Sequence, residues 1–259
     1  MCLLIVLART HGDFPLVVGA NRDELLERPA VAMAVLRDAN PRVVGGRDEL
    51  AGGTWLAVND AGVVAGLTNR PATKDPAKRS RGELPIALAS HTSARAAVDA
   101  LASELRPSDY NPAWLLVGDR DSLFAVDMTG TDNPTVDALG PGIHILENRA
   151  LGEPSPKVDH VRSLLAGIED LDADALVDRL RTVLADHHVP EGATPTRRGD
   201  GDGEPIPAEV KAACVHTERY GTRWSGIVTV PGPADAAPVL RYADGPPCRS
   251  QWRGAPVET

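Results

Sequence analysis

Apolar runs alternate along this chain with short polar turns and with segments of helical spacing. The first run, residues 2–8, is continuous and rich in branched side chains, as expected of a strand buried on both faces. A polar turn and a second apolar run at 15–20 complete a predicted hairpin. Residues 21–53 are charged and contain glycine, and we interpret them as an ordered loop region. Further strands are predicted at 54–58, 63–67, 113–117, 123–126, 143–146, 213–216, 226–230 and 239–242.

Two pairs of helices are predicted between these strands. Ser80 and Glu83 stand three residues apart, with Pro85 in the first turn, which indicates a capping-box start. Ser93 is predicted to cap the second helix. The other helical patterns cover residues 94–105, 158–165 and, after Asp172, 176–184.

The order of elements favours one fold class. Strands, a helix pair, strands, a second helix pair and final strands suit two sheets packed face to face between two helix layers. We therefore expect an α+β protein with a four-layer αββα sandwich, in a single domain over residues 1–259. Residues 190–207 are rich in Gly, Pro and Asp and are predicted to form a loop.

Composition narrows the function classes. The 27 basic and 36 acidic residues leave a net charge of −9, which argues against a nucleic-acid partner. No window approaches the apolar length of a membrane span, and the first apolar run lacks a basic leader, so no membrane insertion is expected. The 3 cysteines form no CxxC pair, which indicates a reduced, cytoplasmic compartment. Nothing in the pattern indicates an oligomeric state.

Cys2 is the most specific candidate for a catalytic residue in the sequence. Removal of Met1 is expected because the second residue is small, and it would leave Cys2 as the first residue. A terminal cysteine carries a thiol nucleophile and an α-amine that titrates near pH 7.7–8.0, so that amine can take the thiol proton. The alternative is that Cys2 only begins a buried strand.

Four polar residues, 21–24, follow the second apolar run. Such a run is usually a solvated turn. However, an antiparallel hairpin returns the chain to its start, so this turn could direct Arg22 or Asp23 toward Cys2.

Several motifs, in order along nearly the whole chain, resemble the NRDE family, also called the transport and Golgi organization protein 2 family. Trp224-Ser225-Gly226 departs from the family pattern, in which small hydroxyl residues are expected at the pocket wall. The motifs are the opening Met-Cys, Ala20-Asn21-Arg22-Asp23-Glu24, Gly52-Gly53-Thr54-Trp55-Leu56-Ala57, Gly66-Leu67-Thr68-Asn69-Arg70, Ser80-Arg81-Gly82, Ile145-Leu146-Glu147-Asn148 and Tyr220-Gly221-Thr222-Arg223.

That family in turn resembles the choloylglycine-hydrolase branch of the N-terminal-nucleophile (Ntn) hydrolases. The resemblance implies that Asp23 accepts hydrogen bonds from the Cys2 amine, and that Asn69 helps to form an oxyanion hole. It implies that Asn148 orients the amine or the substrate carbonyl, and that Arg223 favours the thiolate. The branch's other arginine falls on Ala20 here, so that only the adjacent Arg22 can replace it. These side chains could also have structural roles, as strand-end caps or surface ion pairs.

The leading hypothesis is an Ntn-type hydrolase that cleaves an amide or an acyl (thio)ester bond of a small molecule through Cys2. The alternative is a non-catalytic protein on the same fold that binds or traffics haem, lipid or acyl-CoA, roles that the family resemblance suggests. The sequence leaves the substrate open.

Metal-binding patterns are weaker. Asp200-Gly201-Asp202-Gly203 resembles the start of a calcium loop, but Pro205 stands where its sharp turn needs glycine. His187 and His188 are adjacent and cannot face one metal from a helix, so we interpret them as a solvated helix end.

Cys214 and His216 share a predicted strand face and could bind a metal or haem iron. A core cysteine beside a partly buried histidine is the favoured interpretation. We therefore expect no metal and no cofactor, and haem as a ligand only under the binding alternative.

Overall fold

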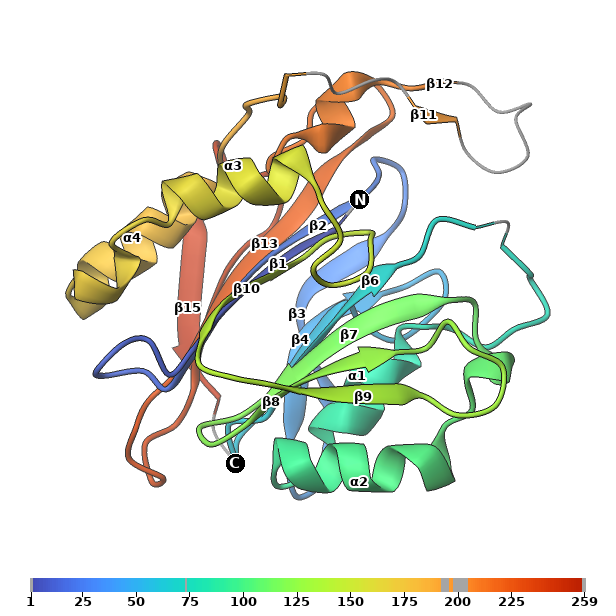
Figure 1. Cartoon of the computed structure of the whole chain (residues 1–259), viewed down its shortest axis with the longest axis vertical. Coiled ribbons are helices and arrows are strands. Elements are labelled where there is room, and N and C mark those ends of the chain that lie inside the picture. Colours follow the sequence, from blue (N-terminus) through green and yellow to red (C-terminus); the bar gives the residue numbers. More distant parts are fainter. Residues whose placement is uncertain (1, 73, 192–195, 198–204, 258–259) are drawn as a thin grey trace.

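The computed structural model describes residues 2–72, 74–191, 196–197 and 205–257. Two antiparallel sheets dominate it (Figure 1). The first sheet runs β10–β1–β2–β13–β14–β15, with β10 Gly142–Leu146, β1 Leu3–Ala8, β2 Leu16–Leu25, β13 Tyr220–Val230, β14 Val239–Ala243 and β15 Trp252–Pro256.

The second sheet follows the chain order from β3 to β9. Its strands are β3 Ala30–Arg37, β4 Val43–Asp48, β5 Leu56–Asn59, β6 Val64–Asn69, β7 Ala113–Gly118, β8 Leu123–Asp127 and β9 Thr135–Leu139. A separate two-stranded ribbon pairs β11 Thr196–Arg197 with β12 Pro205–Ile206.

Each sheet is covered on its outer face by a pair of helices (Figure 1). The helices on the second sheet contact β5 to β8, and those on the first contact β2, β10 and β13. The predicted four-layer αββα order is therefore confirmed. The bounds are α1 Glu83–Ala89 and α2 Ala94–Glu104 on the second sheet, α3 Pro156–Leu164 and α4 Ala173–Leu184 on the first, with 3-10 turns at η1 Pro107–Asp109, η2 Ile168–Asp170 and η3 Ala208–Lys211.

Strand β1 shows how the layers are built. Its apolar run is buried throughout, because alternate side chains enter different cores. Leu4 and Val6 pack between the two sheets, whereas Leu3 and Ile5 pack against α3 and α4. A third apolar cluster fills the space between the second sheet and α1 and α2.

Two predicted helix caps are confirmed. The side chains of Ser93 and Asp172 accept hydrogen bonds from the main-chain amides of Ala96 and Ala175. The capping box at Ser80 is wrong: α1 has Gly82 at its N-cap, and Ser80 donates instead to the carbonyl of Gly52.

The loop predicted over residues 21–53 is wrong for most of its length. Strand β2 continues to Leu25, and β3 and β4 follow it. Two of its charged residues are buried, because Arg22 and Asp48 form an ion pair with each other.

One further sequence interpretation changes at the other end of the chain. Residues 213–216 form no strand, and only His216 makes an isolated bridge, to Gly221. His187 and His188 are exposed just beyond the C-cap of α4, Ala185, so the predicted solvated helix end is confirmed. The 200–203 motif and most of the predicted loop at 190–207 lie outside the described residues.

Candidate active site

Cys2 lies immediately before β1, between the two neighbouring strands of the first sheet. Leu3 pairs with Asn21 on β2, and continuing that register by one residue places Cys2 opposite Arg22. On the other side Leu4 pairs with Leu146, so the same continuation places Cys2 opposite Asn148. The hairpin prediction that residues 21–24 return to Cys2 is therefore confirmed.

The thiol of Cys2 is buried, with 9% of the residue exposed. Burial raises the pKa of the Cys2 thiol, and the negative charge of Asp23 acts in the same direction. A hydrogen bond from the main-chain amide of Asp23 and the charge of Arg22 both oppose this rise in pKa. The environment thus contains groups that favour the thiolate, although burial outweighs them.

Arg22 connects the two sheets through an ion pair and a cation–π contact. Its Nη2 donates to Oδ2 of Asp48 on β4 at 2.7 Å, and its guanidinium stacks 4.5 Å from the ring centroid of Trp55. Arg28 donates to both carboxylate oxygens of the same Asp48. Burial acts to raise the pKa of Asp48. The pKa is nevertheless lowered, because hydrogen bonds from Arg28 and Ala51 and the charges of both arginines outweigh burial.

One donor of Arg22 is left over. Its Nη1 is buried and has no hydrogen-bond partner within the described part of the chain. A buried donor without a partner costs about 1–3 kcal/mol, so such a group requires a cause, such as a catalytic role or a bound water or ion.

Asp23 is held in place by its neighbours on β13. The hydroxyl of Thr222 donates to Oδ1 of Asp23 at 2.6 Å and accepts the main-chain amide of Val215 at 2.9 Å. The hydroxyl of Tyr220 donates to the main-chain carbonyl of Asp23 at 2.7 Å. Asp23 is therefore a fixed carboxylate beside the main-chain position of Cys2.

Asn69 and Asn148 come together although they are 79 positions apart. Nδ2 of Asn148 donates to the main-chain carbonyl of Asn69 at 2.5 Å, at the ends of β6 and β10. The hydroxyl of Thr68 donates to the carbonyl of Glu147 and ties the same two strands. Oδ1 of Asn148 is buried and lacks a partner among the residues that the structure describes. The two asparagines therefore lie together at the adjoining ends of β6 and β10.

Arg223 lies at an irregularity of strand β13. The register of β13 against β2 shifts between Thr222 and Trp224, so Arg223 is the extra residue of a β-bulge. It is half-buried, and its side chain makes no hydrogen bond or ion pair with any of the residues that the structure describes. The structure therefore does not connect Arg223 to Cys2.

Trp224, which replaces the small residues of the family pattern, packs into the core between the sheets. Its ring lies edge-on to Trp55 at 5.4 Å, and Nε1 donates to the carbonyl of Ala32. The departure therefore fills the inter-sheet core.

Arg81 is a residue that the sequence analysis left without a role. Burial lowers the pKa of Arg81, and the charge of Cys2 opposes that change, so Arg81 and a Cys2 thiolate stabilise each other. Its segment is pressed onto the Gly52-Gly53 turn, where a side chain on Gly53 would collide with the main chain of Gly82. The sequence signal for this contact was the pair of glycine-containing motifs, Gly52-Gly53 and Ser80-Arg81-Gly82, whose main chains pack against each other.

A cavity of about 250 Å³ lies along β10 and the start of α3. It is bordered by Glu147, Arg149 and Ser155 in the segment between β10 and α3, and Cys2 does not line it. Among the described residues, no helix combines the length and the apolar character needed to cross a membrane.

Solved structures with this layer order define the class of the fold. A mutant of the conjugated bile acid hydrolase of Clostridium perfringens matches with a TM-score of 0.57 and 11% identity, over 99% of this chain and 92% of that one. The Caenorhabditis elegans ortholog of N-acylethanolamine-hydrolyzing acid amidase matches with a TM-score of 0.58 and 14% identity, over 90% and 94%. The fold is that of the Ntn hydrolases.

Sequence relationships identify the family within this class. The family model for transport and Golgi organisation 2 matches residues 1–236, and the protein belongs to that family. The transport and Golgi organization protein 2 homolog of Bos taurus is 32% identical over 234 residues, 84% of this chain and 82% of the relative. The human homolog is 30% identical over 236 residues, with the same coverage of 84% and 82%.

We predict that Asp48→Ala lowers the free energy of unfolding by about 3–5 kcal/mol, because it leaves the buried charge of Arg22 without compensation. Urea-induced unfolding measures this change. Asp178→Ala is the matched control, since its side chain is 70% exposed in a pair with Arg181 and should change stability by less than about 1 kcal/mol.

The same pair predicts a dependence of stability on pH. The folded pKa of Asp48 lies below its unfolded value, so its contribution is present above that unfolded value and is lost as pH falls through the folded pKa. Asp48→Ala should therefore show a shallower loss of stability on acidification than the unchanged protein. An equal acid slope in the two proteins would contradict this assignment.

We predict that Arg81→Met slows alkylation of Cys2 by roughly three- to tenfold at neutral pH, because it removes a cation that favours the thiolate. Peptide mapping after iodoacetamide treatment is needed, since Cys248 is exposed and will also react. Arg79→Met is the control, because Arg79 pairs with Glu83 on the surface. Equal Cys2 rates in both variants would remove Arg81 from the site.

Proposed function

We propose that this protein is an N-terminal-nucleophile hydrolase in which the Cys2 thiol, after removal of Met1, attacks an amide or acyl (thio)ester carbonyl of a small molecule. The observation that supports it most is the position of Cys2 in the first sheet. The register of β1 sets it between Arg22 and Asn148, next to the fixed carboxylate of Asp23. The two solved neighbours described above are named for hydrolysis of conjugated bile acids and of N-acylethanolamines.

The reaction begins with proton transfer. The free α-amine of Cys2 takes the thiol proton, and the thiolate forms a bond to the carbonyl carbon. Asp23 accepts a hydrogen bond from the resulting ammonium group. Oδ1 of Asn148 is a second acceptor for that group, because Nδ2 of the same side chain is already bonded to the carbonyl of Asn69.

Hydrogen-bond donors must then stabilise the negative charge that develops on the carbonyl oxygen. The side-chain amide of Asn69 supplies one, and Nη1 of Arg22 is a second, since it is buried beside Cys2 with no partner within the described residues. The ammonium group returns its proton to the leaving nitrogen, sulfur or oxygen as the scissile bond breaks. Water then attacks the thioester, gives a proton to the amine, and releases the acid with the regenerated thiol.

The non-catalytic alternative remains a prediction of the sequence. Cys214 and His216, the side chains considered for haem iron, pack against other donor side chains in the structure. No observation in the structure favours haem at that place, and so we do not propose it.

We predict that the mature protein lacks Met1, because the mechanism requires a free Cys2 amine. Intact-mass measurement of the untagged protein decides this. A methionine retained on the whole population would exclude the proposed mechanism.

We predict that a panel of acyl amides and acyl thioesters gives turnover through an acyl-enzyme on Cys2, trapped by rapid acid quench and located by peptide mapping. Cys2→Ser should keep substrate binding and lose at least about tenfold in kcat, because binding contacts survive while the nucleophile weakens. Asp178→Ala should leave turnover unchanged, since its exposed carboxylate pairs with Arg181 outside the proposed site. Turnover that survives in Cys2→Ala would overturn the proposal.

A further inference from the structure

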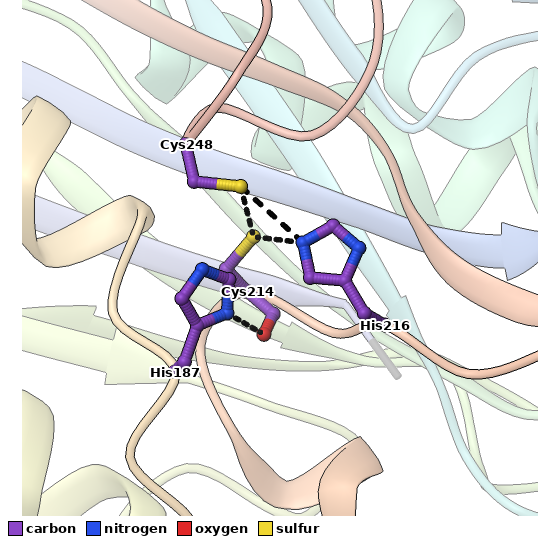
Figure 2. A group of neighbouring side chains, drawn as sticks. All are labelled: His187, Cys214, His216 and Cys248. Carbon is purple, nitrogen blue, oxygen red and sulfur yellow. Dashed lines mark hydrogen bonds between the residues drawn. The ribbon is translucent and has the colours of Figure 1, made fainter.

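Four potential metal ligands meet near the start of β13, at a place that the proposed reaction does not use. They are His187, which follows α4, Cys214 and His216, which follow η3, and Cys248, which follows β14. One donor atom from each lies within 4.8 Å of all the others. Figure 2 shows the four side chains converging from these separate segments.

The distances among the donors of Cys214, His216 and Cys248 match a tetrahedral zinc site. Zinc bonds of about 2.3 Å to sulfur and about 2.0–2.1 Å to nitrogen place two sulfurs about 3.8 Å apart, and a sulfur and a nitrogen about 3.6 Å apart. Here the sulfurs of Cys214 and Cys248 are 3.8 Å apart. Nε2 of His216 lies 3.6 Å from the first sulfur and 3.3 Å from the second.

The fourth donor is oriented by a hydrogen bond on its other side. Nδ1 of His187 contacts the main-chain carbonyl of Cys214 at 3.1 Å, which places the ring proton on Nδ1. Its Nε2 is then an unprotonated acceptor, and Figure 2 shows that nitrogen on the side of the ring toward the sulfur of Cys214. Metal-bound histidines are usually fixed in this way by a carbonyl acceptor.

His216 requires one local adjustment. Nη2 of Arg249 contacts Nδ1 of His216 at 2.5 Å, and arginine can only donate, so Nδ1 has no proton in this arrangement. A metal on Nε2 moves the ring proton to Nδ1 and displaces the guanidinium. Arg249 is exposed and can turn into solvent at little cost.

A disulfide does not account for the paired sulfurs. Cys214 and Cys248 are free thiols, and a distance of 3.8 Å far exceeds a disulfide bond of about 2.05 Å. Haem is also disfavoured, because the four donors converge on one point, whereas a haem iron takes axial ligands on opposite sides of its ring.

We propose that His187, Cys214, His216 and Cys248 bind one Zn²⁺ ion in a closed tetrahedral site that stabilises the segment beside β2. Four protein ligands leave no open position, which is typical of a structural zinc site. Two thiolates balance the ion's charge, and softer sulfur ligands with imidazole suit zinc over calcium or magnesium.

The segment that this zinc holds also supports the candidate active site. The carbonyl of Ala213 accepts a hydrogen bond from Asn21, and the amide of Val215 donates to the hydroxyl that bonds Asp23. Cys214 stands between these two contacts. Loss of the zinc should therefore loosen the support of Asp23 without removing any group from the site.

The test uses the full-length protein, prepared under reducing conditions and dialysed. Elemental analysis by mass spectrometry should find one zinc per chain, and competition with a chromophoric chelator gives its affinity. Replacement by Co²⁺ should give the intense visible bands of a tetrahedral ion and a thiolate-to-cobalt charge-transfer band. Cys214→Ser and Cys248→Ser should each lose at least about tenfold in zinc affinity and lose the charge-transfer intensity of one thiolate.

Two controls make the result specific. His188→Ala should keep the zinc, because His188 packs on His160 and not on the cluster. Cys2→Ala should keep it too, so a failed catalytic proposal leaves this one standing. If the cysteine variants do not fold, His187→Gln measures the same loss, since His187 is exposed.

Four results would overturn the proposal. The first is less than one zinc per chain in the unchanged protein after zinc titration, and the second is zinc retained by the Cys214→Ser, Cys248→Ser double variant. The third is a Cys214–Cys248 disulfide under reducing conditions. The fourth is a bound haem that zinc cannot displace.

Discussion

The buried ion pair between Arg22 and Asp48 is the interaction on which the geometry of this protein depends. It connects β2 of one sheet with β4 of the other at the edge where the chain begins. Two buried charges cost free energy unless both are fully compensated, so the sheets cannot slide or separate here without leaving a charge unpaired. Arg28 and the ring of Trp55 complete the compensation. The packing of the two sheets and the placement of a cation beside Cys2 therefore have the same cause.

The position of Cys2 follows from strand pairing. Because β1 is an interior strand of its sheet, pairing with β2 and β10 positions the first residues of the chain from both sides. Burial then raises the pKa of the thiol, and a reaction through Cys2 has to overcome that cost with local charges and hydrogen bonds. The amide of Asp23 and the cations of Arg22 and Arg81 oppose the effect of burial. A buried nucleophile surrounded by such groups differs from a cysteine that is only part of a core.

The sequence predicted the four layers and the strand ends that meet around Cys2, because apolar periodicity and strand ends are local properties. The hairpin placed Asp23 near Cys2, and the motifs placed Asn69 and Asn148 at strand ends that the structure joins. Strands β3 and β4 were missed for a physical reason. Charged residues in a sequence usually indicate solvent, whereas Arg22, Arg28 and Asp48 form buried or half-buried ion pairs with one another. Arg81 was missed because its position depends on contact between two distant glycine turns.

Spacing indicated Cys214 and His216 as a possible metal pair, but it could not predict the complete cluster around Cys214. Zinc-site signatures depend on ligands that are close in sequence, whereas these four come from three segments that only the completed first sheet brings together. Its neighbours connect it to the rest of the molecule, since Val215 bonds the hydroxyl that positions Asp23. A metal there would act on Asp23 through Thr222, on the side of the carboxylate away from Arg22 and the second sheet. The candidate active site would then be stabilised from two independent directions, by the ion pair between the sheets and by the metal behind β13.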